Sequence, residues 1–221
     1  MRVMVISAHP DDIEPQMGGT IAEYTSKGHE VLIFTLTIPH QDKFGQNIEE
    51  AKKERIEEAE KSANILGAKL ILLDLDQYEI GGQQRKLVQI IEKYIKNFSP
   101  EIIYTCWDKG SHQDHKLVSN AVISATRKND ITLYFFEPII PEGLVPYSFL
   151  ADTYVIIDNV INKKIESIKC YQSQMRKYSD DWVNSIIARN KFTGFRFREI
   201  KANYIESFMT VRRIKHIRQN S

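Results

Sequence analysis

Six histidine and aspartate side chains stand in two short segments, at spacings that suit metal binding: His9, Asp11, Asp12, His112, Asp114 and His115. Each group comes shortly after an apolar run, as a loop after a buried strand does. Two adjacent carboxylates beside an imidazole repel each other strongly once water is excluded. A bound metal ion is the first candidate for the compensating positive charge.

The spacing of these residues selects three candidate ligands. A catalytic zinc site uses three nitrogen or oxygen ligands and leaves one position open for water. His9 and Asp12 are three residues apart on a turning loop and can face one ion, and His115 comes from the second segment. We therefore expect His9, Asp12 and His115 to hold Zn²⁺, although Fe²⁺ suits the same donors.

The three remaining side chains suit the hydrolysis of an amide or an ester. Asp11 is next to the ligands and can take a proton from a metal-activated water, whose pKa falls toward ~7. His112 can stabilise the developing oxyanion or protonate the leaving amine. Asp114 can orient a histidine through the second ring nitrogen of that histidine.

Each of these residues also has a plainer interpretation. Asp11 or Asp12 alone can cap the helix that follows, which is a common role of aspartate. His112 and His115 alone can be surface residues at the start of a helix. The metal site is favoured by the combination of the two segments, which requires a fold that brings them together.

Composition argues against several classes of partner. The chain has 221 residues, of which 42% are hydrophobic and 27% charged, and its formal net charge of +1 gives no reason to expect nucleic acid or an anionic membrane. It has neither a signal-peptide pattern nor an apolar run of ~18 residues. The two cysteines are too few for a disulfide framework, and Cys106 is expected to be a buried packing residue. We expect a cytoplasmic protein.

Apolar runs alternate with helical patterns over most of the chain. Strands are predicted at residues 3–7, 30–37, 69–75, 102–107, 133–137 and 154–157. Helices are predicted at residues 20–26, 47–66, 84–97, 115–128 and 163–177. This alternation predicts one α/β domain over residues 1–221, with a Rossmann-like, doubly wound, mostly parallel sheet and helices on both faces.

The predicted fold also determines where the two segments lie. In doubly wound sheets, ligands bind beyond the carboxyl ends of the strands, at the point where the strand order reverses. That point usually lies between the first strand and the fourth, which are residues 3–7 and 102–107 here. The topology is therefore expected to bring the two segments side by side.

The two segments resemble the motifs of the LmbE/PIG-L family of metal-dependent N-deacetylases. AHPDD-x-E followed by GG stands at residues 8–19, and H-x-D-H stands at 112–115. Weaker similarities extend over essentially the whole chain. They are the R-x-x-E-A motif at 55–59 within the predicted helix, Asp76 after the third strand, YQSQ at 171–174 and Y-x-E-x-F at 204–208.

The resemblance implies zinc on His9, Asp12 and His115, with Asp11 as general base and His112 as electrostatic stabiliser or acid. It also implies that Arg55 and Asp76 contact the sugar or its aglycone. Members of the family remove acetyl groups from N-acetylglucosamine conjugates, so a small-molecule conjugate is the expected substrate, and assembly as a homo-oligomer is left open. The segment TIPHQDKFGQN at 37–47 differs from the glycine-rich stretch of many relatives, so the pocket rim and the exact substrate are not implied.

Two other functions stay open at this point. The same site could act on an acyl group of a non-sugar amine or on an ester. A non-catalytic carbohydrate- or nucleotide-binding protein could also retain this scaffold. The presence of all six histidine and aspartate side chains favours an enzyme. A pure binding protein has no need of Asp11 beside a complete set of metal ligands.

Overall fold

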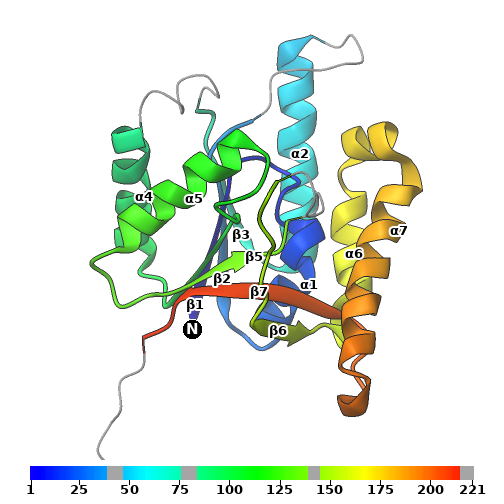
Figure 1. Ribbon diagram of the computed structural model, residues 1–221. Helices are drawn as coiled ribbons and strands as arrows, with labels where there is room; N and C mark the ends of the chain where they lie inside the picture. The colour runs from blue at the N-terminus through cyan, green and yellow to red at the C-terminus, as the bar shows by residue number, and fades with distance from the viewer. Residues whose placement is uncertain (39–46, 76–83, 139–144, 215–221) are drawn as a thin grey trace, which may run out of the picture.

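The computed structural model describes residues 1–38, 47–75, 84–138 and 145–214, which form a seven-stranded sheet with helices on both faces (Figure 1). The strands are β1 (Arg2–Ser7), β2 (Glu30–Thr35), β3 (Lys69–Leu72), β4 (Ile102–Thr105), β5 (Thr132–Phe136), β6 (Thr153–Ile156) and β7 (Ile205–Arg212). Their order is β3-β2-β1-β4-β5-β7-β6. The first five are parallel, and β7 runs antiparallel to β5 and β6. The prediction of a mostly parallel α/β sheet is confirmed.

Helices cover both faces of this sheet. The α-helices are α1 (Glu14–Ser26), α2 (Ile48–Leu66), α4 (Gln84–Phe98), α5 (Gln113–Thr126), α6 (Ile161–Lys169) and α7 (Gln172–Arg196). Figure 1 shows α4 and α5 on one face and α1, α2, α6 and α7 on the other. Among the described residues, none of these helices is long and apolar enough to cross a bilayer.

The interior residues of strand β1 are all apolar because both faces of the strand are covered. Val3 and Val5 pack into the apolar cluster on the face of α1, whereas Met4 and Ile6 pack into the cluster on the face of α4 and α5. All four side chains are completely buried. A central parallel strand is covered on both sides, so an uninterrupted apolar run followed by polar residues marks its carboxyl end.

Several elements differ from the sequence prediction. Helix α1 begins at Glu14 instead of residue 20, and α7 continues to Arg196, beyond the predicted end at residue 177. The helix expected over 163–177 is interrupted, because α6 ends at Lys169 and α7 begins at Gln172, with Tyr171 in a non-helical conformation between them. The buried hydroxyl of Tyr171 donates to Glu14, and this interior contact fixes the break. Strand β7 was not predicted, since its buried Glu206 interrupts the apolar pattern of the strand.

Glu206 fixes helix α1 against the sheet. A kink at Met17 divides α1, so the backbone N–H groups of Gly19 and Thr20 begin a new helical segment. The Glu206 carboxylate accepts from these two N–H groups at 3.0 and 2.6 Å, and it also pairs with the buried Lys164. A carboxylate at the start of a helix is stabilising, because it satisfies free N–H groups and complements the helix dipole.

Candidate metal centre

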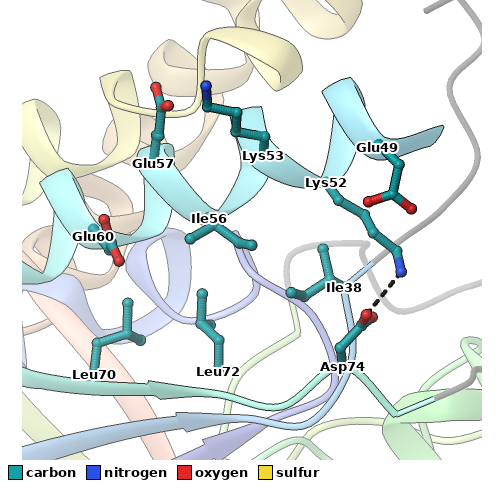
Figure 2. A pocket seen from close by; sticks show the side chains of 10 residues that line it. All are labelled: Ile38, Glu49, Lys52, Lys53, Ile56, Glu57, Glu60, Leu70, Leu72 and Asp74. Atoms are coloured by element: carbon teal, nitrogen blue, oxygen red, sulfur yellow. Dashed lines mark hydrogen bonds and ion pairs between the residues drawn. The ribbon is translucent and has the colours of Figure 1, made fainter. Parts of the chain in front are cut away.

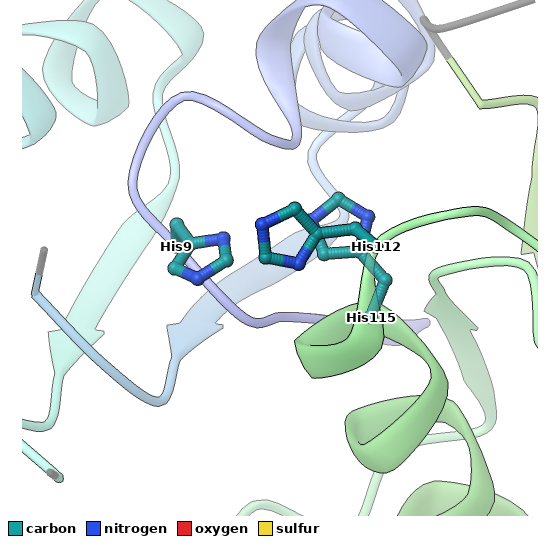
Figure 3. Close-up of side chains that lie close together, drawn as sticks. All are labelled: His9, His112 and His115. Carbon is teal, nitrogen blue, oxygen red and sulfur yellow. The ribbon is translucent and has the colours of Figure 1, made fainter. Parts of the chain in front are cut away.

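The loops that follow β1 and β4 meet at the carboxyl edge of the sheet. The two strands are parallel neighbours, with Ile6 in register with Thr105. His9 lies in the first loop, and His112 and His115 lie at the start of α5. Figure 3 shows the three imidazoles close together, with the His9 ring centroid 5.0 Å from that of His112 and 5.5 Å from that of His115.

The loop after β1 is folded around the carboxylate of Asp12. The backbone N–H of His9 donates to Asp12 Oδ2 at 2.8 Å, and the backbone N–H of Asp12 approaches the His9 carbonyl at 3.5 Å. Asp11, within this turn, has a φ of 86°, which non-glycine residues rarely adopt. The N-cap residue of α1 is Ile13, which makes no side-chain capping bond, so neither aspartate serves as the N-cap.

His9 lies between two carboxylates. Its Nε2 is 3.0 Å from Asp114 Oδ2, and its Nδ1 is 3.5 Å from Asp12 Oδ2. All three residues are buried. If His9 is neutral and its Nε2–H group donates a hydrogen bond to Asp114, the lone pair of Nδ1 lies on the side of Asp12. Asp114 therefore contacts the ring of His9.

The position of His115 relative to Asp12 fits a shared metal ion. Its Nε2 forms an ion pair with Asp12 Oδ1 at 3.1 Å, in an alignment too poor for a well-formed hydrogen bond. With the His9 ring beside the other oxygen of Asp12, this arrangement brings imidazole nitrogens and carboxylate oxygens into one cluster. These are donor types that divalent zinc and iron bind. The residues present fit a divalent ion.

Donor atoms that lie within 4.8 Å of one another form two overlapping groups in the described part of the chain. One group consists of His9, His112 and His115, and the other of Asp12, Cys106 and His115. The predicted set of His9, Asp12 and His115 is divided between these groups, with His115 in both. The cluster therefore contains every predicted ligand together with a sulfur atom that was not predicted to contribute.

Electrostatics at the cluster favour a positive charge. Burial alone would lower the pKa of His9, but the carboxylates of Asp12, Asp114 and Asp11 outweigh burial and raise this pKa to about 10. Burial likewise opposes ionisation of Asp12, but the His115 and His9 imidazoles hold the pKa of Asp12 below its usual range. The carboxylates thus stabilise cations between them, and a metal dication meets the same demand.

Asp11 differs from Asp12 in its surroundings. Burial raises the pKa of Asp11 to about 7, against the opposing effect of the Arg55 guanidinium. Arg55 Nη1 lies 3.3 Å from Asp11 Oδ2 and 3.8 Å from Glu58 Oε2. A carboxyl group whose pKa is near neutrality is suited to accept and release a proton at physiological pH. Arg55, predicted to contact the substrate, lies against this carboxyl group.

His112 is the N-cap residue of α5. Its Nδ1 accepts a hydrogen bond from the backbone N–H of Asp114 at 3.3 Å. Burial and the neighbouring His115 and His9 rings lower the pKa of His112. A neutral His112 with Nδ1 as acceptor carries its proton on Nε2, where it can be donated to a bound molecule.

A groove lies between α2 and the edge strand β3 (Figure 2). Its volume is about 570 Å³, its floor includes Ile56, Leu70 and Leu72, and its rim includes the ion pair of Lys52 with Asp74. None of the six histidine and aspartate residues lines it. Asp76, the second predicted substrate contact, lies outside the described residues.

Sequence reasoning missed a buried polar network behind Asp11. Glu14 Oε1 accepts from the Tyr171 hydroxyl at 2.9 Å and from Ser62 Oγ at 2.7 Å. The backbone N–H of Asp11 donates to the Tyr171 oxygen. Glu14 belongs to the AHPDD-x-E motif, which was the signal available, but its partners come from α2 and from the break before α7.

The chain is similar in sequence and in fold to several known enzymes. The chain is 28% identical over 188 residues to the diacetylchitobiose deacetylase of Thermococcus kodakarensis, covering 78% of this chain and 70% of that protein. It is 26% identical over 192 residues to the 4-oxalmesaconate hydratase of Pseudomonas putida, covering 77% and 73%. The solved structure of N,N'-diacetylchitobiose deacetylase from Pyrococcus horikoshii has a TM-score of 0.80 at 20% identity, covering 95% of this chain and 83% of that one.

The sequence model of the PIG-L family, described as GlcNAc-PI de-N-acetylase, matches residues 4–126. This match includes most of β1, all of β4 and α5, and the loops after the two strands, so all six residues of the cluster lie within it. It spans more than half of the chain. The chain therefore belongs to the PIG-L family of de-N-acetylases, and it is an enzyme.

Proposed function

We propose that this protein is a zinc-dependent hydrolase that removes an N-acetyl group from an amino-sugar conjugate of the N-acetylglucosamine type. The observation that carries the proposal is the meeting of His9, Asp12 and His115, with His115 Nε2 3.1 Å from Asp12 Oδ1 and His9 Nδ1 3.5 Å from Asp12 Oδ2. Family membership adds that relatives of this chain are named deacetylases.

His9, Asp12 and His115 would hold the ion. A bound Zn²⁺ would supply Lewis acidity to the acyl carbonyl and would lower the pKa of a water molecule toward ~7. Asp114 keeps the His9 ring oriented through Nε2, so that Nδ1 faces Asp12. In this proposal, His9, Asp12 and His115 hold the ion and Asp114 orients His9. Asp11 then remains for proton transfer and His112 for stabilising the oxyanion.

Asp11 would receive a proton from the attacking water and pass it on to the leaving amine. Its pKa of about 7 allows both steps near neutral pH. The adjacent Arg55 guanidinium favours the ionised form that is required first. Arg55 and Asp76 are proposed in addition as contacts of the sugar or its aglycone.

His112 would donate from Nε2 to the substrate oxygen that gains negative charge. Its Nδ1 is already engaged with the Asp114 backbone N–H, so the donor position is fixed before substrate binds. Pre-oriented donors of this kind contribute about 2.7–4 kcal/mol to transition-state stabilisation in hydrolases.

The direct test measures metal content and acetate release from a panel of N-acetylglucosamine conjugates. We expect Asp11→Asn to keep its zinc and to lose ~10²- to 10⁴-fold in kcat, and His115→Ala to lose zinc. The matched controls are Asp181→Asn, at an exposed residue, and His29→Ala, at a partly buried residue, neither of which belongs to the cluster. Full acetate release by both Asp11→Asn and His115→Ala would falsify the mechanism.

A second candidate is the addition of water to an unsaturated carboxylate. It is favoured by the 26% identity to a protein named 4-oxalmesaconate hydratase, over 77% of this chain. The same cluster would then activate water toward a carbon–carbon double bond. Loss of the substrate's ultraviolet absorbance on incubation with 4-oxalmesaconate, with no acetate released from any acetylated sugar, would favour this candidate over deacetylation.

A further inference from the structure

Cys106 directly follows β4, and its sulfur faces two charged side chains. The Sγ atom, a carboxylate oxygen of Asp12 and a ring nitrogen of His115 all lie within 4.8 Å of one another. Cys106 is 1% exposed and Asp12 is 8% exposed, so the sulfur is at the buried base of the cluster. Asp12 comes from the loop after β1, Cys106 from the first position after β4, and His115 from the start of α5.

Packing explains only part of the environment of this residue. Cys106 shares an apolar cluster with Val5, Met17 and Tyr104, and an aliphatic side chain of similar size would fill that space equally well. A buried carboxylate close to the sulfur adds nothing to apolar packing. The thiol therefore lies at the boundary between the core and the polar cluster of Asp12 and His115.

A second observation at the same point is the position of His115 Nε2. This nitrogen pairs with Asp12 Oδ1 at 3.1 Å, in an alignment too poor for a well-formed hydrogen bond. His115 is also the residue that the two donor groups of the site have in common. The His115 nitrogen and the Cys106 sulfur therefore lie next to the same region, although they come from different elements.

We propose that Cys106 is a sulfur ligand of the metal centre, joining Asp12 and His115 around a thiophilic divalent cation such as Zn²⁺ or Co²⁺. The proposal rests on the proposed function only for the existence of a metal centre. Zinc bonds to sulfur at about 2.3 Å and to nitrogen at about 2.0 Å, so one ion between the three donors can reach all of them after small side-chain movements.

The coordination step is balanced without an oxidant or reductant. The S–H bond of Cys106 breaks, a sulfur–metal bond forms, and the proton leaves to solvent. With His9 also bound, zinc can expand to five ligands and still admit water. A thiolate in the donor set favours zinc over harder ions such as Mn²⁺, and so it would settle a choice that nitrogen and oxygen donors leave open.

The test is a Co²⁺ titration of the full-length, metal-stripped protein, followed by absorption spectroscopy. The wild type is expected to show visible ligand-field bands together with a sulfur-to-cobalt charge-transfer band in the near ultraviolet. Cys106→Ser and Cys106→Ala should lose the charge-transfer band and keep the ligand-field bands, with a ~10- to 100-fold or greater loss of metal affinity. Cys170→Ser, which removes the other cysteine, should retain both sets of bands.

The outcomes separate this proposal from the proposed function. Ligand-field bands without a charge-transfer band in the wild type overturn the role of Cys106 and leave the metal centre intact. Absence of all bands overturns the metal centre and the sulfur ligand together. If neither Cys106 variant folds by circular dichroism, ¹¹³Cd NMR of the wild type decides, because a sulfur ligand moves the cadmium resonance far downfield and a nitrogen and oxygen donor set does not.

Discussion

Asp11 has a backbone conformation that most L-residues avoid, in a turn between two proposed metal ligands. Its φ of 86° costs on the order of 1–3 kcal/mol unless the surroundings enforce it. Part of this enforcement comes from the Tyr171 hydroxyl, which accepts from the Asp11 N–H and donates to Glu14. Tyr171 is therefore a positioning residue for the proposed general base.

Replacing Tyr171 with Phe removes this support without changing the packing of the ring. Two hydrogen bonds are lost, and the one that positions Asp11 contributes ~1–1.5 kcal/mol, which corresponds to about a tenfold fall in kcat. KM is expected to change little because Tyr171 is buried away from solvent. Steady-state deacetylation kinetics check this, with the half-exposed Tyr178→Phe as control. A lower melting temperature with unchanged kcat would show that Tyr171 serves stability alone.

At the scale of elements, helix α1 is pressed against the segment that follows β6. A Cβ atom added at Gly19 would lie 2.7 Å from two side-chain atoms of Ile157, which is completely buried. Neighbouring Gly18 has space, because an added Cβ there would be no closer than 3.4 Å to any atom. The two adjacent glycines therefore have different roles.

We expect Gly19→Ala to lower the free energy of unfolding by ~1–3 kcal/mol or more, because the overpacked core must shift. Gly18→Ala is the matched control. It is expected to be near neutral, because the helix preference of alanine, ~1 kcal/mol, offsets the close contacts at 3.4 Å. Urea denaturation followed by circular dichroism measures both variants. Equal stabilities of the two variants would contradict the close approach of α1 to Ile157.

Asp158 joins the end of β6 to the segment that leads into β7. Its carboxylate accepts from the backbone N–H groups of Asn203 and Tyr204 at 2.6–3.1 Å. Slight burial opposes ionisation, but these N–H groups outweigh it and lower the pKa of Asp158. A folded-state pKa below the unfolded one adds stability above the unfolded pKa, and that stability is lost as the pH falls through the folded pKa.

Asp158→Ala should therefore destabilise the protein by about 1 kcal/mol at pH 7, a value kept small because the carboxylate is partly exposed. The difference from wild type should shrink below about pH 4, where the unfolded aspartate is protonated. Denaturation at a series of pH values measures it. A difference that stays constant down to the acid limit would show that the carboxylate charge is not involved.

At the scale of the whole molecule, the metal centre connects the two halves of the sheet. One side of the cluster follows β1 and the other follows β4, so an ion bound by both loops stabilises only the folded chain. Zinc at 100 times its Kd should add ~2.7 kcal/mol, which is roughly 5–10 °C in Tm for a chain of this size. A chelator should reverse the shift, and His115→Ala should not show it. An equal zinc-induced shift in His115→Ala would place the ion elsewhere.

Several features of the fold could be predicted because they depend on local pattern. The apolar run of β1 predicts a strand covered on both faces, and Gly67 with a φ of 70° ends α2 where the sequence suggests. Strand β7 and the break at Tyr171 could not be predicted. Each depends on a buried polar side chain, Glu206 or Tyr171, whose partners are far away in the sequence.

For the site, the sequence by itself determined the identity of the chemical groups and the loops that carry them. Parallel strands of a doubly wound sheet bring the loops after β1 and β4 together whatever the side chains are. Only the tertiary structure decided the pairing within the cluster: Asp114 with His9, Arg55 with Asp11, and the Cys106 sulfur beside Asp12. Spacing along a chain fixes which loop a residue occupies, whereas the direction of a side chain depends on backbone turns and on neighbours contributed by other elements.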